Sequence, residues 1–277
     1  MESNNFDQKT IDDFGDEWNL FQQNKLSGKE LFNIYKNYFS IFPWNQINKS
    51  SIGADIGCGT GRWAYYVAPK IKTLYCVDPS SKALNIAKSN LNSNDNCVFL
   101  KEHVGNLSLQ NDSLDFAYSL GVLHHIPDTF KALKECVKKL KKGAPFLVYL
   151  YYNFENKSFF LKFIWKLSNI LRKIISNIPF KIKKLITDFF ALIIYLPLAR
   201  LSLLFSKLNI NSTFMPLSFY KDKSFYTMRT DSLDRFGTKI EQRFSKSKIY
   251  EMMTSSNLTG ILFLEKEPFW VAVGFKK

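Results

Sequence analysis

Apolar and polar positions between residues 51 and 154 follow a pattern that predicts strands alternating with helices. Short apolar runs at 51–56, 72–77, 97–101, 114–119 and 144–152 predict five strands. Amphipathic stretches at 80–91 and 128–140 predict helices; Ser80 or Ser81 is suited to cap the first, and Gly143 follows the second. Strands that alternate with helices in this way predict a doubly wound, mostly parallel α/β sheet.

The flanking segments extend this sheet and cover it. Residues 1–50 are polar with Phe14, Trp18 and Phe21 at helical spacing, and a second apolar stripe ends at Pro43, so this part predicts an N-terminal helical cap. Residues 245–255 predict a further helix, and 260–264 with 269–275 predict an antiparallel hairpin. We therefore expect a seven-stranded sheet and four parts: a cap at 1–50, a core at 51–154, an insertion at 155–215, and a substrate-side loop with the rest of the core at 216–277.

The insertion at 155–215 breaks the alternation and is rich in Phe, Ile, Leu and Lys. Apolar residues fall on one helical face and lysines on the other, and Pro179 and Pro197 predict a division into three helices. The apolar run from Phe189 to Ala199 is too short and too interrupted to predict a membrane-spanning helix. Three roles stay open: a lid with its apolar face on the core, an amphipathic element on a membrane surface, and a nucleic-acid contact.

Charge and cysteine content narrow the classes of protein. The chain has 277 residues and a formal net charge of +14, and the insertion alone holds ten Lys and Arg against two acids. No zinc spacing or aromatic-plus-basic strand pattern accompanies that charge, so nucleic acid is not expected as a partner. The four cysteines form no CxxC pair, which predicts no metal site and a reducing, cytoplasmic compartment. The polar, acidic N-terminus is unlike a signal peptide.

A glycine-rich loop after the first strand carries the strongest chemical signal. Asp55 precedes Gly57-Cys58-Gly59-Thr60-Gly61, and Asp78 ends the second strand, 17 residues after Gly61. Glycines let a ligand approach the backbone closely. An acid at the end of the second strand suits ribose hydroxyls, and an acid before the glycines suits an ammonium group, directly or through water. A ligand with a ribose and an amino acid, such as S-adenosylmethionine, fits these parts better than NAD does.

The chain here resembles the class I S-adenosylmethionine-dependent methyltransferases. Four stretches carry the resemblance: ADIGCGTGRW (54–63), LYCVDPS (74–80), NDSLDFAYSLGVLHHIPD (111–128) and LKECVKKLKKGAPFLVY (133–149). It implies a Rossmann-like fold and methyl transfer from S-adenosylmethionine, with S-adenosylhomocysteine as the product. The combination is specific for the superfamily and says little about the substrate.

The resemblance also implies which residues bind the cofactor. Asp78 would bind the ribose and Pro79 would lie beside the adenine. An acid that relatives carry after the third strand is absent here, so Asn106 or backbone groups would contact the adenine instead. Backbone carbonyls at the end of the fourth strand would face the methionine part. The complete set is Asp55, Gly57, Cys58, Gly59, Gly61, Asp78, Pro79, Val104, Gly105, Asn106, Ser119, Leu120 and Gly121.

Candidate catalytic and substrate-binding residues lie after these motifs. His124 and His125 follow the fourth strand, where a histidine would serve as a general base or would only pack the loop. Arg229, Asp231 and Arg235 would hold an acidic substrate group or would form an internal ion-pair network. Asp115, before the fourth strand, is interpreted as structural.

These observations predict a cytoplasmic methyltransferase that acts on a small-molecule or lipid-like acceptor. Peripheral attachment to the inner membrane surface is also expected, because anionic lipid would attract the basic insertion. Two alternatives stay open. One is another enzyme with a nucleotide ligand, such as an oxidoreductase; the other is a non-catalytic binding protein that retains the cofactor fold.

Overall fold

The computed structural model describes residues 5–23, 26–155, 157–212, 214–266 and 268–277. Contacts within the chain divide it into two compact units. The sheet unit takes in the described residues of 1–23, 31–155 and 240–277, and the helical unit takes in those of 24–30 and 156–239. The helical unit therefore extends well beyond the insertion that we expected to end at residue 215.

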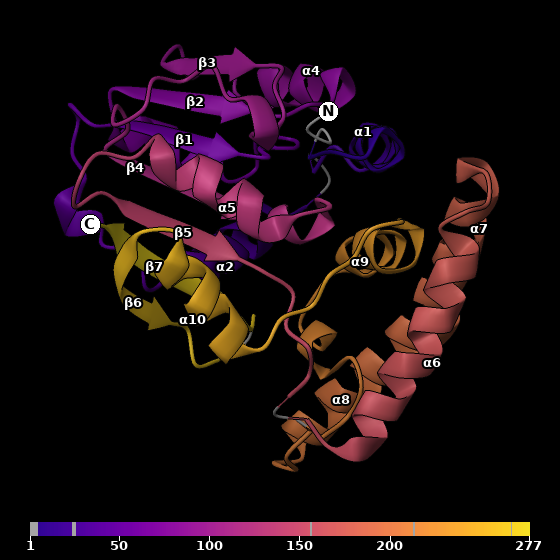
Figure 1. Ribbon diagram of the computed structural model, residues 1–277. Coiled ribbons are helices and arrows are strands. Elements are labelled where there is room, and N and C mark those ends of the chain that lie inside the picture. The colour runs from indigo at the N-terminus through magenta and orange to yellow at the C-terminus, as the bar shows by residue number, and fades with distance from the viewer. Residues whose placement is uncertain (1–4, 24–25, 156, 213, 267) are drawn as a thin grey trace. The chain divides into compact units, whose positions relative to one another are not determined.

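The sheet unit contains the expected seven-stranded, mostly parallel sheet (Figure 1). Its strands lie in the order β3-β2-β1-β4-β5-β7-β6, and only β7 runs antiparallel to its neighbours β5 and β6. The hairpin link between β6 and β7 includes residue 267, which lies outside the described residues. The strands are β1 (Ile52–Ile56), β2 (Thr73–Val77), β3 (Cys97–Leu100), β4 (Phe116–Leu120), β5 (Pro145–Tyr149), β6 (Leu258–Phe263) and β7 (Val271–Lys276).

Helices cover both faces of this sheet, because successive residues of a buried strand point to opposite sides. α5 (Thr129–Lys138) and α10 (Lys246–Ser255) pack on one face, and Figure 1 shows them on the same side. α2 (Gly28–Tyr38), α3 (Ala64–Val67) and α4 (Ser81–Asn90) contribute to the core on the other face. This arrangement confirms the doubly wound α/β fold that the alternating pattern predicts.

The helix starts follow the capping signals in the sequence. Ser80 caps α4 by accepting a hydrogen bond from the Ala83 N–H at 3.4 Å. Asp128 caps α5 in the same way through the Lys131 N–H at 2.9 Å. Such caps satisfy backbone donors that the first helical turn leaves free. They hold α4 and α5 at the carboxyl ends of the strands, where the conserved geometry of this fold class places ligands.

The helical unit has a small core of its own, built from Ile175, Tyr195, Ala199, Met228 and Phe236. Its elements are α6 (Phe159–Ile175), α7 (Phe180–Phe190), a π-helical turn (Ala191–Tyr195), α8 (Leu196–Lys207), a short 3-10 turn (Ser218–Tyr220) and α9 (Phe225–Gly237). Residues 225–237, which we expected to form a loop, are helical because Ser224 caps them and Met228, Leu233 and Phe236 are buried.

The expected break at Pro197 is wrong. Pro179 does precede α7, but Pro197 lies in the first turn of α8, directly after the π-helical turn. Pro197 has no N–H to donate to the preceding helical turn, and the widened π-helical turn before it accommodates this loss without ending the helix. One continuous helix results, Phe180–Lys207. Among the described residues it is the one helix long and apolar enough to cross a membrane by length and composition.

Candidate active site

The glycine loop leaves the end of β1 and folds back over the end of β2. The N–H groups of Gly57 and Cys58 both donate to the Val77 carbonyl, at 2.8 and 3.0 Å. Gly57 has a φ of +79°, and a Cβ there would lie 2.4 Å from a Val122 methyl group. Glycine is therefore required at this position, both for the backbone conformation and for the close approach of the loop after β4.

Asp78, at the end of β2, joins the glycine loop to the start of α4. Its two carboxylate oxygens accept the N–H groups of Gly59 and Ser80, each at 2.9 Å. Burial raises the pKa of Asp78 to about 6, while the hydrogen bonds from Ser80 and Gly59 lower it. The side chain that caps α4 is Ser80, so Asp78 is not needed for that role. Each of its oxygens retains acceptor capacity for a ligand hydroxyl.

Asp55, the residue before the last in β1, is a buried carboxylate whose Oδ2 has no hydrogen-bond partner. The pKa of Asp55 is raised to about 8, and burial is the largest cause. The charge of Asp78 also raises this pKa, whereas the Tyr118 hydroxyl and the Arg62 guanidinium lower it. The Tyr118 hydroxyl lies near Asp55, but the two groups are not aligned for a hydrogen bond. An unpaired buried carboxylate is costly, so this position fits a ligand that brings a positive charge or a donor.

The remaining cofactor-binding candidates lie along the same edge of the sheet. Val104–Asn106 forms a 3-10 turn in which Val104 is buried while Gly105 and Asn106 are exposed. The Ser119 hydroxyl donates to the Ile56 carbonyl at 2.8 Å and so joins β4 to β1. Gly121 follows β4, and its N–H donates to the Tyr149 carbonyl. Pro79 is half-buried beside Asp78. Direct contact of these residues with a cofactor stays a prediction.

Helix α1 (Gln8–Leu20) lies against the glycine loop. The Trp18 indole is next to Gly59, and the Arg62 guanidinium lies over both the Trp18 ring and the Trp63 ring, 5.4 and 4.4 Å from their centroids. Asp16 of the same helix forms an ion pair with Lys82 of α4. The polar leader thus covers the loop through an aromatic and a charged contact, with Phe14 reaching to 4.9 Å from the His125 ring.

The two histidines after β4 differ in their surroundings. His124 is fully buried, its ring stacks on Tyr151 at 3.8 Å, and neither ring nitrogen has a hydrogen-bond partner. Burial, aided by His125 and Arg243, holds the pKa of His124 well below its usual value, so this ring is neutral. The His125 Nδ1 lies 2.7 Å from the Ile240 carbonyl, which requires a proton on Nδ1.

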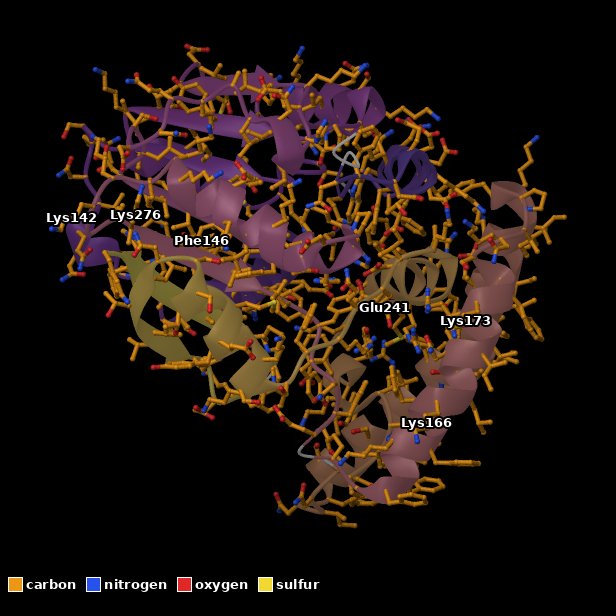
Figure 2. The ribbon with its side chains drawn as sticks, in the orientation of Figure 1. Lys142, Phe146, Lys166, Lys173, Glu241 and Lys276 are labelled. Atoms are coloured by element: carbon orange, nitrogen blue, oxygen red, sulfur yellow. The ribbon has the colours of Figure 1, made fainter. Side chains whose placement is uncertain are left out.

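A buried ion pair beside these rings was missed by the sequence reasoning. Arg243 pairs with Glu241 at 2.8 Å, and both side chains are nearly inaccessible, at 12% and 1% exposure. Arg243 also donates to the Tyr152 carbonyl and lies over the Tyr151 ring, 5.0 Å from its centroid (Glu241 is labelled in Figure 2). The one sequence signal for this ion pair is the spacing Glu-x-Arg before a predicted helix. Many solvent-exposed ion pairs have the same spacing, so it does not predict burial.

The three predicted substrate-binding residues all lie on α9 in the helical unit. Arg229 donates to both oxygens of Asp188 on α7, at 2.8 and 2.9 Å. Arg235 donates to the Ser168 hydroxyl on α6 at 2.9 Å. Asp231 is half-buried between them. These contacts hold the helical unit together, and the role of the three residues toward a substrate stays a prediction.

No group of three or more His, Cys, Asp or Glu within the described ranges is arranged to hold a metal ion. The four cysteines are free thiols, and Cys58 of the glycine loop is buried. Asp115, interpreted as structural, accepts the Ile52 N–H at 2.7 Å and pairs with Lys141 at 2.7 Å, at the opposite ends of the strands from the loop.

Known proteins with similar sequences are methyltransferases. A family model described as a methyltransferase domain matches residues 54–148. A ubiquinone/menaquinone biosynthesis C-methyltransferase from Campylobacter jejuni is 33% identical over 102 residues, which is 34% of this chain and 42% of that protein. A tRNA U34 carboxymethyltransferase from Aliarcobacter butzleri is 29% identical, covering 42% and 37%. A sterol 4-C-methyltransferase from Caenorhabditis elegans is 28% identical, covering 45% and 39%. The chain spans less than half the length of these curated relatives.

Solved structures agree on the fold. An S-adenosylmethionine-dependent methyltransferase from Thermotoga maritima superposes with a TM-score of 0.51 at 18% identity, covering 97% of this chain and 100% of that one. A Bacillus halodurans structure described as a methyltransferase gives 0.53 at 12% identity, covering 84% and 73%. S-adenosylmethionine is the methyl donor of the matched family, and the glycine loop, Asp55 and Asp78 fit its parts. Residues 54–148 therefore belong to a class I S-adenosylmethionine-dependent methyltransferase domain.

Proposed function

We propose that this protein transfers the methyl group of S-adenosylmethionine to a small-molecule or lipid-like acceptor. The observation that carries the proposal is the pair of buried carboxylates around the glycine loop. Asp78 retains acceptor capacity beside the loop, and Asp55 has an oxygen without a partner. A ribose and an amino-acid ammonium group would satisfy these two positions, and a pyrophosphate would satisfy neither because it is itself an anion.

Each part of the loop edge has a role in this proposal. Asp78 accepts ribose hydroxyls and Asp55 accepts the ammonium group. Pro79 and the turn at Val104–Asn106 contact the adenine, and backbone groups of Ser119–Gly121 contact the methionine part. S-adenosylmethionine, when bound, supplies a methyl group activated by the neighbouring sulfonium. Helix α1 keeps water from the loop through Trp18, which favours transfer to the acceptor over hydrolysis.

The acceptor side of the site favours an apolar or aromatic molecule. Tyr149 lies 5.0 Å from the Tyr38 ring and 5.7 Å from the Tyr151 ring, and His124 and His125 adjoin them. His125 is the better candidate for a general base. Its Nδ1 proton is held by Ile240, so a neutral ring has its lone pair on Nε2 and can take a proton from an acceptor hydroxyl or amine. His124 supports Tyr151 by stacking.

The names of the curated relatives include quinone, sterol and tRNA enzymes, and the aromatic surroundings of Tyr149 support the first two kinds of acceptor. A tRNA would need a positive surface around the acceptor, whereas the segment 155–215, with ten Lys and Arg against two acids, carries +8 of the formal net charge of +14. We propose a cytoplasmic location, consistent with four free thiols, with reversible attachment to the inner membrane surface.

Methyl transfer can be tested with S-adenosylmethionine labelled in its methyl group. The full chain is incubated with a lipid extract, a water-soluble metabolite extract, or total tRNA, and label is counted in each fraction. We expect enzyme-dependent label in the lipid or small-molecule fraction, lost in the Asp78→Ala variant. Label only in tRNA would overturn the acceptor class, and no label in any fraction, together with protection by NAD in thermal unfolding, would overturn methyl transfer.

A further inference from the structure

The helices of the helical unit carry apolar stripes on their exposed sides. On α6 the stripe recurs at intervals of three and four residues, which places its members on one side of the helix. These side chains are half-exposed or more: Phe160 at 64%, Phe163 at 50%, Leu167 at 49%, Ile170 at 58% and Ile174 at 61%. A surface helix of a soluble protein ordinarily turns such a stripe toward the core.

The continuous helix Phe180–Lys207 repeats the arrangement. Up to the second residue of the π-helical turn the same three-four spacing relates Ile182, Leu185, Phe189 and Leu192, all 52–69% exposed. After the turn it relates Leu201, Leu204 and Leu208, at 41–60%. Only 22% of the most apolar window of this helix is buried. An exposed apolar area of this extent marks a site of contact with a membrane or another protein.

The inward sides of the same helices combine the small apolar core described above with buried polar contacts. Arg172 of α6 donates to the Thr238 and Lys239 carbonyls, at 2.8 and 2.9 Å. Lys183 of α7 is buried and donates to the Gly237 carbonyl at 2.9 Å, and the Ser232 hydroxyl of α9 donates to the Thr187 carbonyl at 2.9 Å. The helices are therefore fixed to α9 by hydrogen bonds, and their apolar sides are left outward.

Basic side chains border the exposed stripes. Lys166 and Lys173 lie about two turns apart on α6 (Figure 2), Lys181 and Lys184 lie on α7, and Arg200 and Lys207 lie on α8. The one acid between residues 159 and 207 is Asp188, and it is paired with Arg229 and Lys184. A second copy of this face would bring like charges together, because a two-fold contact sets the same patch against itself. The charge instead complements an anionic surface.

We propose that the outward faces of α6 and of the helix Phe180–Lys207 form a docking surface for an anionic lipid bilayer. The apolar stripes enter the boundary between headgroups and acyl chains, and the lysines contact the headgroups. The helix Phe180–Lys207 lies in the plane of this boundary. Crossing the bilayer would separate it from α9, which would take Lys183 away from the Gly237 carbonyl and Asp188 away from Arg229, and would place these charges in hydrocarbon. This proposal does not depend on the identity of the methyl acceptor.

Flotation of the full chain with vesicles tests the surface. The vesicles are phosphatidylcholine alone or phosphatidylcholine with phosphatidylglycerol, at low and high salt. We expect partition into the anionic vesicles to be at least about tenfold stronger than into the neutral ones at low salt, with much of the difference lost at high salt. Soluble protein with both vesicle types at low salt would overturn the proposal.

Matched substitutions test whether vesicle binding depends on this surface or only on the total charge and on any exposed apolar side chain. Ile174→Asp removes part of the stripe, and Tyr250→Asp on α10 is its control because Tyr250 is similarly exposed, at 54%. Lys166→Glu with Lys173→Glu reverses the basic edge, and Lys72→Glu with Lys142→Glu, exposed in the sheet unit, is its control. We expect about tenfold weaker binding for the first member of each pair and little change for the second.

Two results would contradict the proposal in these variants. One is equal loss of binding in the test and control variants. The other is a wild-type dimer in light scattering that Ile174→Asp converts to a monomer while vesicle binding stays absent, which would make the surface a contact between two copies. Circular dichroism and S-adenosylhomocysteine binding confirm that each variant is folded, since all of the substitutions lie outside the glycine loop.

Discussion

The Trp18 indole lies against Gly59, and a Cβ built on that glycine would be 3.2 Å from the indole nitrogen. The helical cap and the glycine loop are therefore in close contact at residue 59, where a side chain would press on the indole. Arg62 extends the contact by lying over the Trp18 ring. The cap thus contacts the glycine loop through Trp18, and Asp78 accepts a hydrogen bond from the Gly59 N–H of the same loop.

Gly59→Val should abolish S-adenosylhomocysteine binding. The side chain would push against Trp18, and a φ of +53° is strained for any residue with a Cβ. Gly143→Val is the matched control, because Gly143 has a φ of +79° with open space around it and lies far from the loop in sequence. Both variants should lose about 1–2 kcal/mol of stability from backbone strain, and only the first should lose binding by calorimetry. Equal affinity in the folded Gly59→Val protein would place the cofactor elsewhere.

Asp78→Ala should weaken S-adenosylhomocysteine binding at least tenfold. Each charge-assisted hydrogen bond lost to the ribose costs about 1.5–3 kcal/mol, and the Gly59 N–H loses its acceptor as well. Asp115→Ala is the control, since it removes a carboxylate that accepts a backbone N–H away from the loop. It should lower the melting temperature and leave affinity unchanged. A loss of less than threefold in Asp78→Ala would leave that residue only its structural role.

Asp55 should make both stability and cofactor affinity depend on pH, in opposite directions. Its folded pKa of about 8 lies above the ordinary value of 3.8, so the free protein gains stability from the protonated form and loses it as pH rises from about 4 to about 8. The loss has a limit of about 1.4 kcal/mol per pH unit. Cofactor binding needs the carboxylate and should therefore strengthen between pH 6 and pH 8.

Asp55→Asn removes the titrating group and provides the comparison. Urea unfolding should show wild-type stability falling relative to this variant as pH rises toward 8. Calorimetry should show the pH dependence of S-adenosylhomocysteine affinity flattened in the variant. Parallel stability curves for the two proteins across this pH range would mean that Asp55 is not protonated in the free protein.

The two histidines should respond differently to replacement. His125→Asn retains a donor toward the Ile240 carbonyl but removes Nε2, so methyl transfer should fall by about 10²–10⁴ while cofactor affinity is kept. His124→Phe retains the stacking on Tyr151 and should leave most of the transfer rate. A rate that survives in His125→Asn would show that alignment of the acceptor suffices without a base.

Much of the sheet unit follows from local signals in the sequence. The apolar runs that become β1 to β5 are separated by capping residues, Ser80 and Asp128, that act within one helical turn. The glycine loop is equally local, because Asp55, the glycines and Asp78 are joined across two adjacent parallel strands. Interactions of this short range can be recognised from residue type and spacing alone.

The parts that were not predicted depend on contacts between distant residues or on burial that arises only in the folded chain. Arg229 meets Asp188 on another helix, and Glu241 becomes a buried partner of Arg243 only after folding. The amphipathic pattern of α6 correctly predicts a helix, but periodicity does not show which side of that helix faces the core. A π-helical turn accommodates Pro197, and no residue type in the sequence predicts that turn.

Calorimetric titration of the full chain with S-adenosylhomocysteine, beside an equal titration with NAD, tests the central claim most directly. Asp55 and Asp78 are placed to accept hydrogen bonds, and a pyrophosphate would meet two carboxylates there. We predict one S-adenosylhomocysteine site per chain and no heat from NAD. Saturable NAD binding without S-adenosylhomocysteine binding would contradict the account and identify the loop as a dinucleotide site.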